Sequence, residues 1–197
     1  YVFLYEDSGA GFTFIETVSN FSNNSSAAPT VEISGDFLFV GDYTNNKVCI
    51  YSFILLKSGT TTHTTINQAS NQSTFGKTIV CKDGNTTSPN LFIGDPTAEV
   101  QYESPSNFTA TTGAVYHYGI EVENMSASFV QTLLPNFTET PNSIDLGGYA
   151  EDGSVLDVDS KFGLYLDVKK FNNQLYVAVG SPNWYVDSDV ESIDNRE

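Results

Sequence analysis

Short runs in which apolar and aromatic residues alternate with polar ones recur along all 197 residues of the chain. Gly, Asn, Asp or Pro interrupts these runs every few positions, as expected for strands joined by turns. No stretch of ten residues combines apolar positions three or four apart with good helix formers. The pattern predicts an all-β sandwich, barrel or propeller, with strands over residues 1–5, 12–18, 31–34, 37–40, 47–55, 62–67, 77–82, 91–93, 114–120, 128–133, 164–169 and 174–179.

Two parts of the chain repeat the same order of features. Gly94-Asp95-Pro96 ends an apolar strand, and its glycine lies 18 positions after the glycine of Phe75-Gly76. Gly180-Ser181-Pro182 ends another apolar strand, 17 positions after the glycine of Phe162-Gly163. A weaker copy, Phe39-Val40-Gly41-Asp42, has no Phe-Gly before it. Two copies with such similar spacing favour a repeat over chance.

An aromatic strand follows the glycine corner in these copies. It is Gly113-Ala114-Val115-Tyr116-His117-Tyr118 in one copy and Lys47-Val48-Cys49-Ile50-Tyr51 in another. Tyr1-Val2-Phe3-Leu4-Tyr5 has the same pattern. The repeat therefore extends over most of the chain.

This order of Phe-Gly, Gly-x-Pro and aromatic strand resembles the FG-GAP repeat of integrin alpha subunit heads and related surface proteins. The resemblance implies that each repeat is a four-stranded blade of a seven-bladed propeller. Physically, the corner Gly permits a positive φ or a close approach, Pro blocks a further ladder bond, and aromatic residues fill the wedge between blades. The residues that match the motif are Phe75, Gly76, Gly94, Pro96, Gly113, Tyr116, Tyr118, Phe162, Gly163, Gly180 and Pro182.

From the number of copies and the resemblance, we expect the whole chain, residues 1–197, to form one partial β-propeller of about three blades. We expect the end of a blade at 1–28, a complete blade at 29–73, a blade with long insertions at 74–160 and the start of a blade at 161–197. Three blades cannot close a ring, because propellers typically use about four to eight. The segment is therefore expected to pack against further blades, from a longer chain or from another subunit.

Integrin-type repeats often hold calcium in a loop of alternating carboxylates before the Gly-x-Pro strand. Here residues 81–88 contain one carboxylate and residues 167–173 have two lysines at ligand positions, so calcium is not expected in either loop. Alternating acids that could chelate calcium occur elsewhere, at Asp187, Asp189 and Glu191 and in the group Asp145, Glu151, Asp152, Asp157 and Asp159. A solvated acidic loop is the preferred interpretation, because the first stretch follows Gly-x-Pro and lacks the turn Gly. No other cofactor is expected.

Charge and hydropathy exclude some partners. Eight Lys and Arg against 24 Asp and Glu give a net charge of −16, which disfavours nucleic acid. No apolar run approaches the roughly 18 to 20 residues of a membrane-spanning helix, so we expect no membrane insertion by this segment. Ser, Thr and Asn number 21, 20 and 17, whereas charged residues make up 16%, so neutral polar groups should form much of the surface.

Eight Asn-x-Ser/Thr sequons indicate the secretory pathway, where N-linked glycans are added. Random placement of these residues would give roughly 3.5 sequons, although an Asn- and Thr-rich proteome would also raise the number. Each sequon lies in or beside a predicted loop, as a bulky hydrophilic glycan requires. The sequence starts at Tyr1 without a leader, so a signal peptide was removed or lies outside the segment. The acceptor residues are Asn20, Asn23, Asn24, Asn71, Asn85, Asn107, Asn124 and Asn136.

The two cysteines and two histidines provide little reactive chemistry. Cys49 and Cys81 could form a disulfide in a secreted protein or remain two buried thiols in a cytosolic one. His63 and His117 lie in strands without a nearby Ser or Cys in a strand-turn-helix context that would expose a nucleophile. No phosphate loop or metal-binding His pair occurs, so the chain is not expected to be an enzyme.

Three functions fit these patterns. The preferred one is a non-catalytic extracellular or cell-surface module for protein interaction or adhesion, with variable loops on a fixed FG-GAP-like frame within a larger glycoprotein or assembly. A lectin-like or carbohydrate-active β protein and a purely structural subunit of a surface filament are the alternatives. Residues 137–197 contain no sequon, and eleven of the 24 acidic residues lie from Asp145 onward, so this end is expected to face neighbouring blades or a partner protein.

Overall fold

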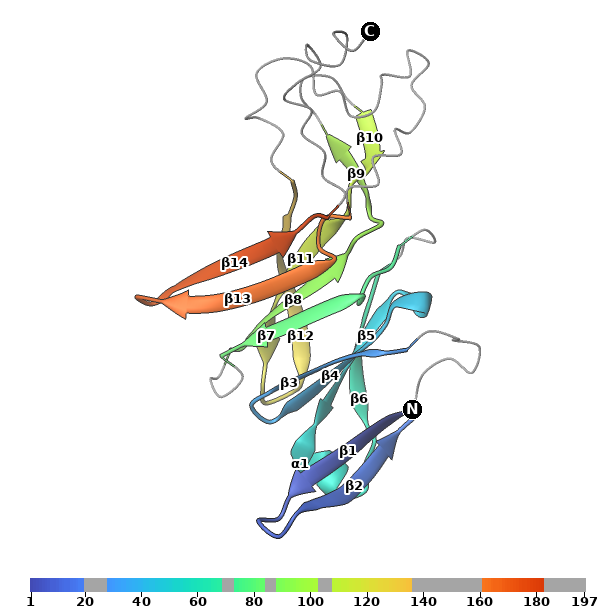
Figure 1. The fold of residues 1–197 in the computed structure, drawn as a ribbon, viewed down its shortest axis with the longest axis vertical. Helices are drawn as coiled ribbons and strands as arrows, with labels where there is room; N and C mark the ends of the chain where they lie inside the picture. Colours follow the sequence, from blue (N-terminus) through green and yellow to red (C-terminus); the bar gives the residue numbers. More distant parts are fainter. Residues whose placement is uncertain (20–27, 69–72, 84–87, 103–107, 136–160, 183–197) are drawn as a thin grey trace, which may run out of the picture.

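Antiparallel strands form most of the regular structure, as the alternating pattern predicts. The computed structural model describes residues 1–19, 28–68, 73–83, 88–102, 108–135 and 161–182. Figure 1 shows two larger sheets in the middle of the molecule, with the hairpin β1–β2 at the lower end, β9–β10 toward the upper end and β13–β14 beside the second sheet. The predicted all-β class is confirmed.

The two larger sheets are antiparallel and four-stranded, and each uses its strands in chain order. The first sheet contains β3 (Thr30–Ser34), β4 (Phe37–Asp42), β5 (Lys47–Ser52) and β6 (His63–Asn67). The second sheet contains β7 (Thr78–Lys82), β8 (Asn90–Asp95), β11 (Ala114–Glu121) and β12 (Ser126–Leu133).

Three two-stranded hairpins complete the described fold. The N-terminal hairpin is β1 (Val2–Asp7) with β2 (Phe12–Val18), and the C-terminal hairpin is β13 (Tyr165–Phe171) with β14 (Gln174–Gly180). The inserted hairpin, β9 (Glu99–Tyr102) with β10 (Phe108–Thr111), lies in the connection between β8 and β11.

The strand register repeats between the sheets. Thr30 is opposite Gly41 in the first sheet, and Thr78 is opposite Gly94 in the second. Tyr165 is opposite Gly180 in the C-terminal hairpin. The corner glycines therefore occupy one structural position, as the sequence repeat predicts.

The sheets stack face to face, with an apolar cluster in each interface. Alternation along each strand sends successive side chains to opposite faces, so one strand contributes to two clusters. In the first sheet, Leu38 and Tyr51 pack toward the N-terminal hairpin, whereas Phe39 and Ile50 pack toward the second sheet. Phe92 of the second sheet packs with the C-terminal hairpin.

The first strands of successive sheets, β3, β7 and β13, lie next to one another (Figure 1). The Thr30 hydroxyl donates to the Lys77 carbonyl oxygen at 2.9 Å, and the Thr78 hydroxyl donates to the Leu164 carbonyl oxygen at 2.6 Å. The same hydrogen bond therefore joins two successive pairs of sheets. The opposite edges of the two four-stranded sheets are β6 and β12.

Glycine contacts hold the sheets at close range. A Cβ on Gly41 would lie 2.1 Å from the Gly76 carbonyl oxygen, and one on Gly94 would lie 2.1 Å from the Gly163 carbonyl oxygen. Separations below 3.0 Å are not tolerated by a real Cβ, so both positions require glycine.

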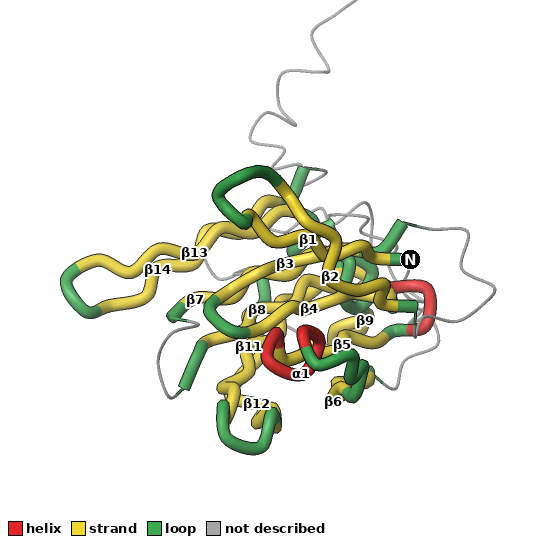
Figure 2. The backbone as a smooth tube through the Cα atoms, turned by 90° about the horizontal axis from the view of Figure 1, so that it is seen from below, coloured by secondary structure: helices red, strands yellow, loops and turns green. Residues whose placement is uncertain are grey.

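Two parts of the fold differ from the strand prediction. The strand expected over residues 47–55 ends at Ser52, and a short helix, α1 (Phe53–Lys57), follows. The helix places Leu56 in the cluster with Tyr51, and Figure 2 shows it beside β5. The strands of the inserted hairpin were not predicted, because β9 and β10 are only four residues long and offer just two apolar positions each for the alternation to be recognised.

Candidate functional site

A buried aspartate follows the corner glycine at the end of β4 and of β8. Asp42 is 4% exposed and Asp95 is 0% exposed. Burying a carboxylate is costly unless hydrogen bonds or an opposite charge compensate it. Both aspartates therefore indicate a built polar cluster at the same corner of the two sheets.

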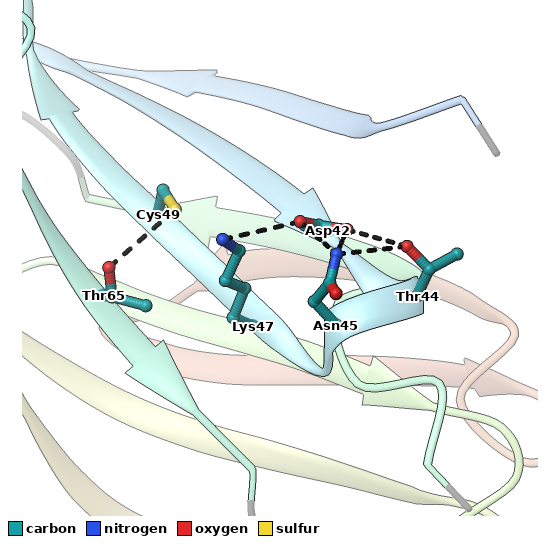
Figure 3. Close-up of polar contacts among 6 residues, drawn as sticks. All are labelled: Asp42, Thr44, Asn45, Lys47, Cys49 and Thr65. Carbon is teal, nitrogen blue, oxygen red and sulfur yellow. Dashed lines mark hydrogen bonds and ion pairs between the residues drawn. The ribbon is translucent and has the colours of Figure 1, made fainter. Parts of the chain in front are cut away.

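The Asp42 cluster anchors a short connection between β4 and β5 (Figure 3). This connection is the single turn η1 (Tyr43–Asn45). The Thr44 hydroxyl donates to Asp42 Oδ1 at 2.9 Å, and Asn45 Nδ2 donates to both carboxylate oxygens at 2.8 Å. Lys47 Nζ lies 3.6 Å from Asp42 Oδ2 and supplies the opposite charge.

The Asp95 cluster anchors a much longer connection, which contains the inserted hairpin. The Ser73 hydroxyl donates to Asp95 Oδ2, and the Thr74 backbone N–H donates to Oδ1 at 2.8 Å. The Thr97 backbone N–H also donates to Oδ1, at 3.4 Å. Asp95 therefore joins the segment before β7 to the start of the inserted connection.

Tyr116 lies near Asp95 and is hydrogen-bonded to Gln68, the residue that follows β6 of the first sheet. Gln68 Nε2 donates to the Tyr116 hydroxyl at 2.9 Å. Burial, together with the charge of Asp95, raises the pKa of Tyr116 to about 12. Tyr116 therefore stays protonated at neutral pH and does not act as a base there.

The inserted hairpin has a packed base. Ala98, Val100 and Ala114 form a small buried cluster, against which Tyr116 packs. Gly113 ends the connection with a positive φ of 82°, and a Cβ there would lie 2.3 Å from the Phe162 carbonyl oxygen. The corresponding position after the short connection is Asn46, whose φ is 53°. One corner geometry thus accommodates connections of very different length.

The structure brings the two halves of the sequence motif into contact. The Gly76 N–H donates to the Gly94 carbonyl oxygen at 3.2 Å, and the Gly163 N–H donates to the Gly180 carbonyl oxygen at 3.3 Å. Phe75 is fully buried between the sheets, and its ring meets that of Tyr116 edge-on at 5.5 Å. Tyr118 and Pro96 are also buried, Phe162 is half-buried, and Pro182 is exposed.

Sequence reasoning did not select Asp42 and Asp95 as a functional pair. The signal was present, since Phe39-Val40-Gly41-Asp42 and Phe92-Ile93-Gly94-Asp95 share the Gly-Asp pair. Within the described ranges, no three His, Cys, Asp or Glu side chains are grouped so that they could hold a metal ion.

Most of the predicted glycosylation and calcium residues lie outside the described residues. These are Asn20, Asn23, Asn24, Asn71, Asn85, Asn107 and Asn136, together with Asp187, Asp189, Glu191 and the acidic group at 145–159. Asn124 is described, and it is exposed in the turn between β11 and β12. Its Nδ2 donates to Glu121 Oε2 at 3.0 Å, and its Oδ1 accepts the Ser126 N–H at 3.0 Å.

Cys49 and Cys81 form no disulfide and are separate buried thiols. They cannot pair in this fold without rearrangement, because Cys49 packs toward the N-terminal hairpin and Cys81 packs between the two sheets. Burial raises the pKa of both thiols, that of Cys81 to about 11.

We expect the folded protein to resist thiol reagents. At pH 8, a pKa of about 11 leaves roughly 0.1% of the Cys81 thiol as the reactive thiolate. A thiol titration should therefore find no rapidly reacting cysteine in the native chain and two after unfolding without reductant. A titre of zero in the unfolded, unreduced chain would mean that a disulfide exists.

His117 is a half-buried base on β11 of the second sheet. Its ring stacks on Phe92 at 4.5 Å, its Nε2 is 2.9 Å from Asn90 Oδ1, and its Nδ1 has no hydrogen-bond partner among the described residues. Burial lowers the pKa of His117 below its usual 6.5. The other histidine, His63, has its ring centroid 4.9 Å from that of Tyr51.

His117 should make stability depend on pH. Below pH 6.5 the unfolded chain binds a proton that the folded chain resists, so stability is complete above pH 6.5 and falls as the pH falls toward the lowered folded-state pKa. One proton gives a slope of at most about 1.4 kcal/mol per pH unit. Urea denaturation at pH 7.5 and 5.5 should show a smaller loss for His117→Gln than for the unsubstituted chain. Equal losses would exclude His117 as the cause.

The N-terminal hairpin exposes an aromatic face that does not touch the first sheet. Phe3, Tyr5 and Phe14 are 58%, 55% and 50% exposed, and Phe12 is 78% exposed. The rings of Tyr5 and Phe14 meet edge-on at 5.8 Å. Contiguous exposed aromatic residues of this kind usually mark a binding surface.

Comparisons of the chain with protein-family models, with curated proteins and with solved structures find no match. The resemblance to FG-GAP repeats therefore stays a prediction that rests on the repeated residues. Within the described residues, no helix has the length and apolarity that crossing a bilayer requires.

Proposed function

We propose that the chain is a non-catalytic protein-interaction module, formed by part of an FG-GAP-like β-propeller. In this arrangement the first and second sheets are complete blades. The N-terminal hairpin is the outer half of a blade, and the C-terminal hairpin is the inner half of another. The first strands β3, β7 and β13 then surround the propeller axis.

Three observations support the propeller arrangement. The register at the corner glycine repeats in three successive units. The first strands of these units contact one another, and equivalent hydroxyl-to-carbonyl hydrogen bonds join them. Apolar clusters fill the interfaces, as the wedges between blades require. A sandwich would instead pair two extended sheets across one core.

The observation that most supports an interaction function is the difference between the two corner connections. Asp42 and Asp95 anchor equivalent corners, but the first connection is one turn and the second contains the inserted hairpin. A fixed frame with connections of variable length is typical of binding proteins, because surface loops change without disturbing the core. The inserted hairpin is therefore the proposed contact element.

An extracellular or cell-surface setting fits this proposal. The excess of sequons indicates N-linked glycans, and Asn124 lies exposed in a turn where a glycan would not disturb packing. The net charge of −16 favours protein partners with basic surfaces over nucleic acid. No catalytic step is proposed, because the two thiols are buried and the rings of His63 and His117 pack against those of Tyr51 and Phe92.

Replacing the inserted connection tests the proposal. Residues 96–113 are exchanged for Tyr-Thr-Asn-Asn, the sequence of the short connection at 43–46. The variant should fold with the same circular dichroism spectrum but lose binding to partners selected by the unsubstituted chain from a display library of extracellular proteins. A control variant replaces the exposed turn at residues 8–11 with Asn-Gly, and should keep binding. Retained binding without the inserted hairpin would refute its proposed role.

A further inference from the structure

The two terminal hairpins are complementary halves of one sheet. Val2 is opposite Val18 in the N-terminal hairpin, as Val48 is opposite Ile66 in the first sheet and Val115 is opposite Leu133 in the second. A bulge also interrupts β1–β2 after Leu4 and β11–β12 after His117, which are equivalent positions. The N-terminal hairpin thus corresponds to a third and a fourth strand, whereas the C-terminal hairpin corresponds to a first and a second strand.

The N-terminal hairpin and β3 expose positions that are buried elsewhere in the repeat. Val31 and Ile33 are 50% and 58% exposed, whereas the equivalent Ile79 and Cys81 of the second sheet are 4% and 2% exposed. In the C-terminal hairpin, Val168, which is equivalent to Ile33, is 1% exposed. In those two places the first two strands of the preceding sheet lie against the buried positions, because β7 contacts β3 and β4, and β13 contacts β7 and β8.

The aromatic face shows the same difference. Tyr5 is 55% exposed, but the equivalent Tyr51 and Tyr118 are 0% and 9% exposed. Phe3, at 58%, corresponds to Cys49, at 0%. Within the described residues, no strand pairs with the free edge of β1 or with that of β14. An open edge beside exposed apolar residues is a template for a further strand.

A hairpin of the β13–β14 type fits this vacant place in register. If β14 pairs with β1 as β4 pairs with β5, then Gly180 lies opposite Val2, Val179 opposite Phe3 and Val177 opposite Tyr5. Val177 and Val179 would then share a face with Phe3 and Tyr5, because side chains alternate along both strands. The four strands would form a sheet of order β13-β14-β1-β2, like the two complete sheets.

One polar contact is also reproduced in this arrangement. Glu32 Oε1 accepts the Cys81 N–H at 3.2 Å, between the first strands of the two sheets. Asp167 occupies the position of Glu32 in the C-terminal hairpin. In the proposed sheet, the Asp167 carboxylate would lie near the backbone N–H of Ile33, the residue equivalent to Cys81. It would have the same charge as the Glu32 carboxylate that accepts the Cys81 N–H.

We propose that the β13–β14 hairpin of one copy pairs with the β1 edge of a second copy, so that the chain associates head to tail. The proposal rests on the propeller arrangement proposed above. Each copy supplies two complete sheets and two halves. Two copies joined at both ends would contain six four-stranded sheets, within the range of about four to eight that closes a propeller ring. Such a head-to-tail contact closes when its rotation completes a circle.

An engineered disulfide tests the pairing. The double variant Phe3→Cys, Val179→Cys places one thiol on each strand of the proposed pair, on the same face. Mild oxidation should give a covalent dimer of the 21.5 kDa chain. The matched control is Phe3→Cys, Ala178→Cys, because Ala178 points to the opposite face and should crosslink at least about tenfold less. The native thiols are buried and equal in both variants.

Sedimentation velocity of the unsubstituted chain provides the second measurement. A dimer is expected, and added salt should strengthen it, because two copies of charge −16 repel each other at low ionic strength. Tyr5→Lys should dissociate the dimer at least about tenfold more readily than Ile54→Lys. Both residues are exposed, at 55% and 71%, but Ile54 lies on α1, away from the free edge.

A chain that stays monomeric at about 100 μM and 0.5 M salt, or a crosslink formed within one chain, would overturn the second copy as the partner. Whether the contact between Thr78 and Leu164 is still observed shows which proposal has failed, the head-to-tail pairing alone or the propeller arrangement as well. A monomer that keeps this contact refutes only the head-to-tail pairing. Loss of the contact refutes the propeller arrangement as well.

Discussion

Gly94→Ala is expected to lower the free energy of unfolding by about 3 kcal/mol or more. The added Cβ would lie 2.1 Å from the Gly163 carbonyl oxygen and 3.2 Å from Thr78 Cβ. Both obstacles are held in place, since the Gly163 N–H is bonded to Gly180 and the Thr78 hydroxyl to Leu164. The second sheet and the C-terminal hairpin must therefore separate to accommodate the methyl group. Urea denaturation followed by circular dichroism measures the change.

Gly119→Ala is the matched control for this substitution. Gly119 lies in β11, the strand paired with β8, but a Cβ there meets only a Val130 methyl group at 4.0 Å. Replacing a strand glycine without strain should change stability by less than about 1 kcal/mol and can increase it. Equal effects of the two substitutions would mean that the sheets do not approach each other at Gly94.

Asp95→Asn is expected to cost about 3 kcal/mol of folding stability. The carboxylate is fully buried and accepts hydrogen bonds from Ser73, from Thr74 and from Thr97. The Asn side chain has one acceptor oxygen where the carboxylate has two. Its NH2 group would therefore face one of these hydrogen-bond donors and leave that donor without a partner. Each buried donor without a partner costs about 1–3 kcal/mol. Thermal unfolding and urea denaturation should both show the loss.

Asp7→Asn is the control for the loss of a carboxylate charge. Asp7 accepts the Gly9 N–H at 2.8 Å but is exposed to solvent. Its replacement should change stability by less than about 0.5 kcal/mol, because the Asn oxygen can still accept the Gly9 N–H and the side chain stays solvated. If Asp95→Asn were equally mild, the Asp95 cluster would not be what anchors the corner of the second sheet.

The all-β class and most of the strand positions could be predicted because the alternation of apolar residues follows the strand period. Residues 12–18 and 174–179, for example, correspond to β2 and to β14 within one residue. The equivalence of Gly94 and Gly180 could also be predicted from the sequence, since each glycine comes at the end of an apolar strand, 18 or 17 positions after the glycine of a Phe-Gly pair. These features depend on local sequence and on repetition.

The helix α1 and the inserted hairpin could not be predicted in the same way. Residues 53–57 continue an apolar run, and the helical turn places Leu56 in the buried cluster with Leu38 and Tyr51. The inserted hairpin depends on packing of Ala98 and Val100 against Ala114. Tertiary contacts of this kind cannot be inferred from the spacing of apolar residues along the sequence.

The Asp42 and Asp95 clusters could be predicted only in part from the sequence. Gly41-Asp42 and Gly94-Asp95 were visible as a repeat, but burial of the carboxylates depends on partners at positions 44, 45, 47, 73, 74 and 97. The cysteines show the same limitation. Their number is compatible with a disulfide, and the two faces on which Cys49 and Cys81 lie decide against it.

Nuclear Overhauser effects between the first strands of successive units test the propeller arrangement most directly. The propeller arrangement predicts contacts of the Thr30 side chain with residues 77 and 78 and of the Thr78 side chain with residues 164 and 165, because the two hydrogen bonds are 2.9 and 2.6 Å long. These residues are 47 and 86 positions apart in the chain, so local structure cannot produce such contacts. A spectrum with all cross-strand contacts inside the two sheets, but none between β3 and β7 or between β7 and β13, would contradict the propeller arrangement.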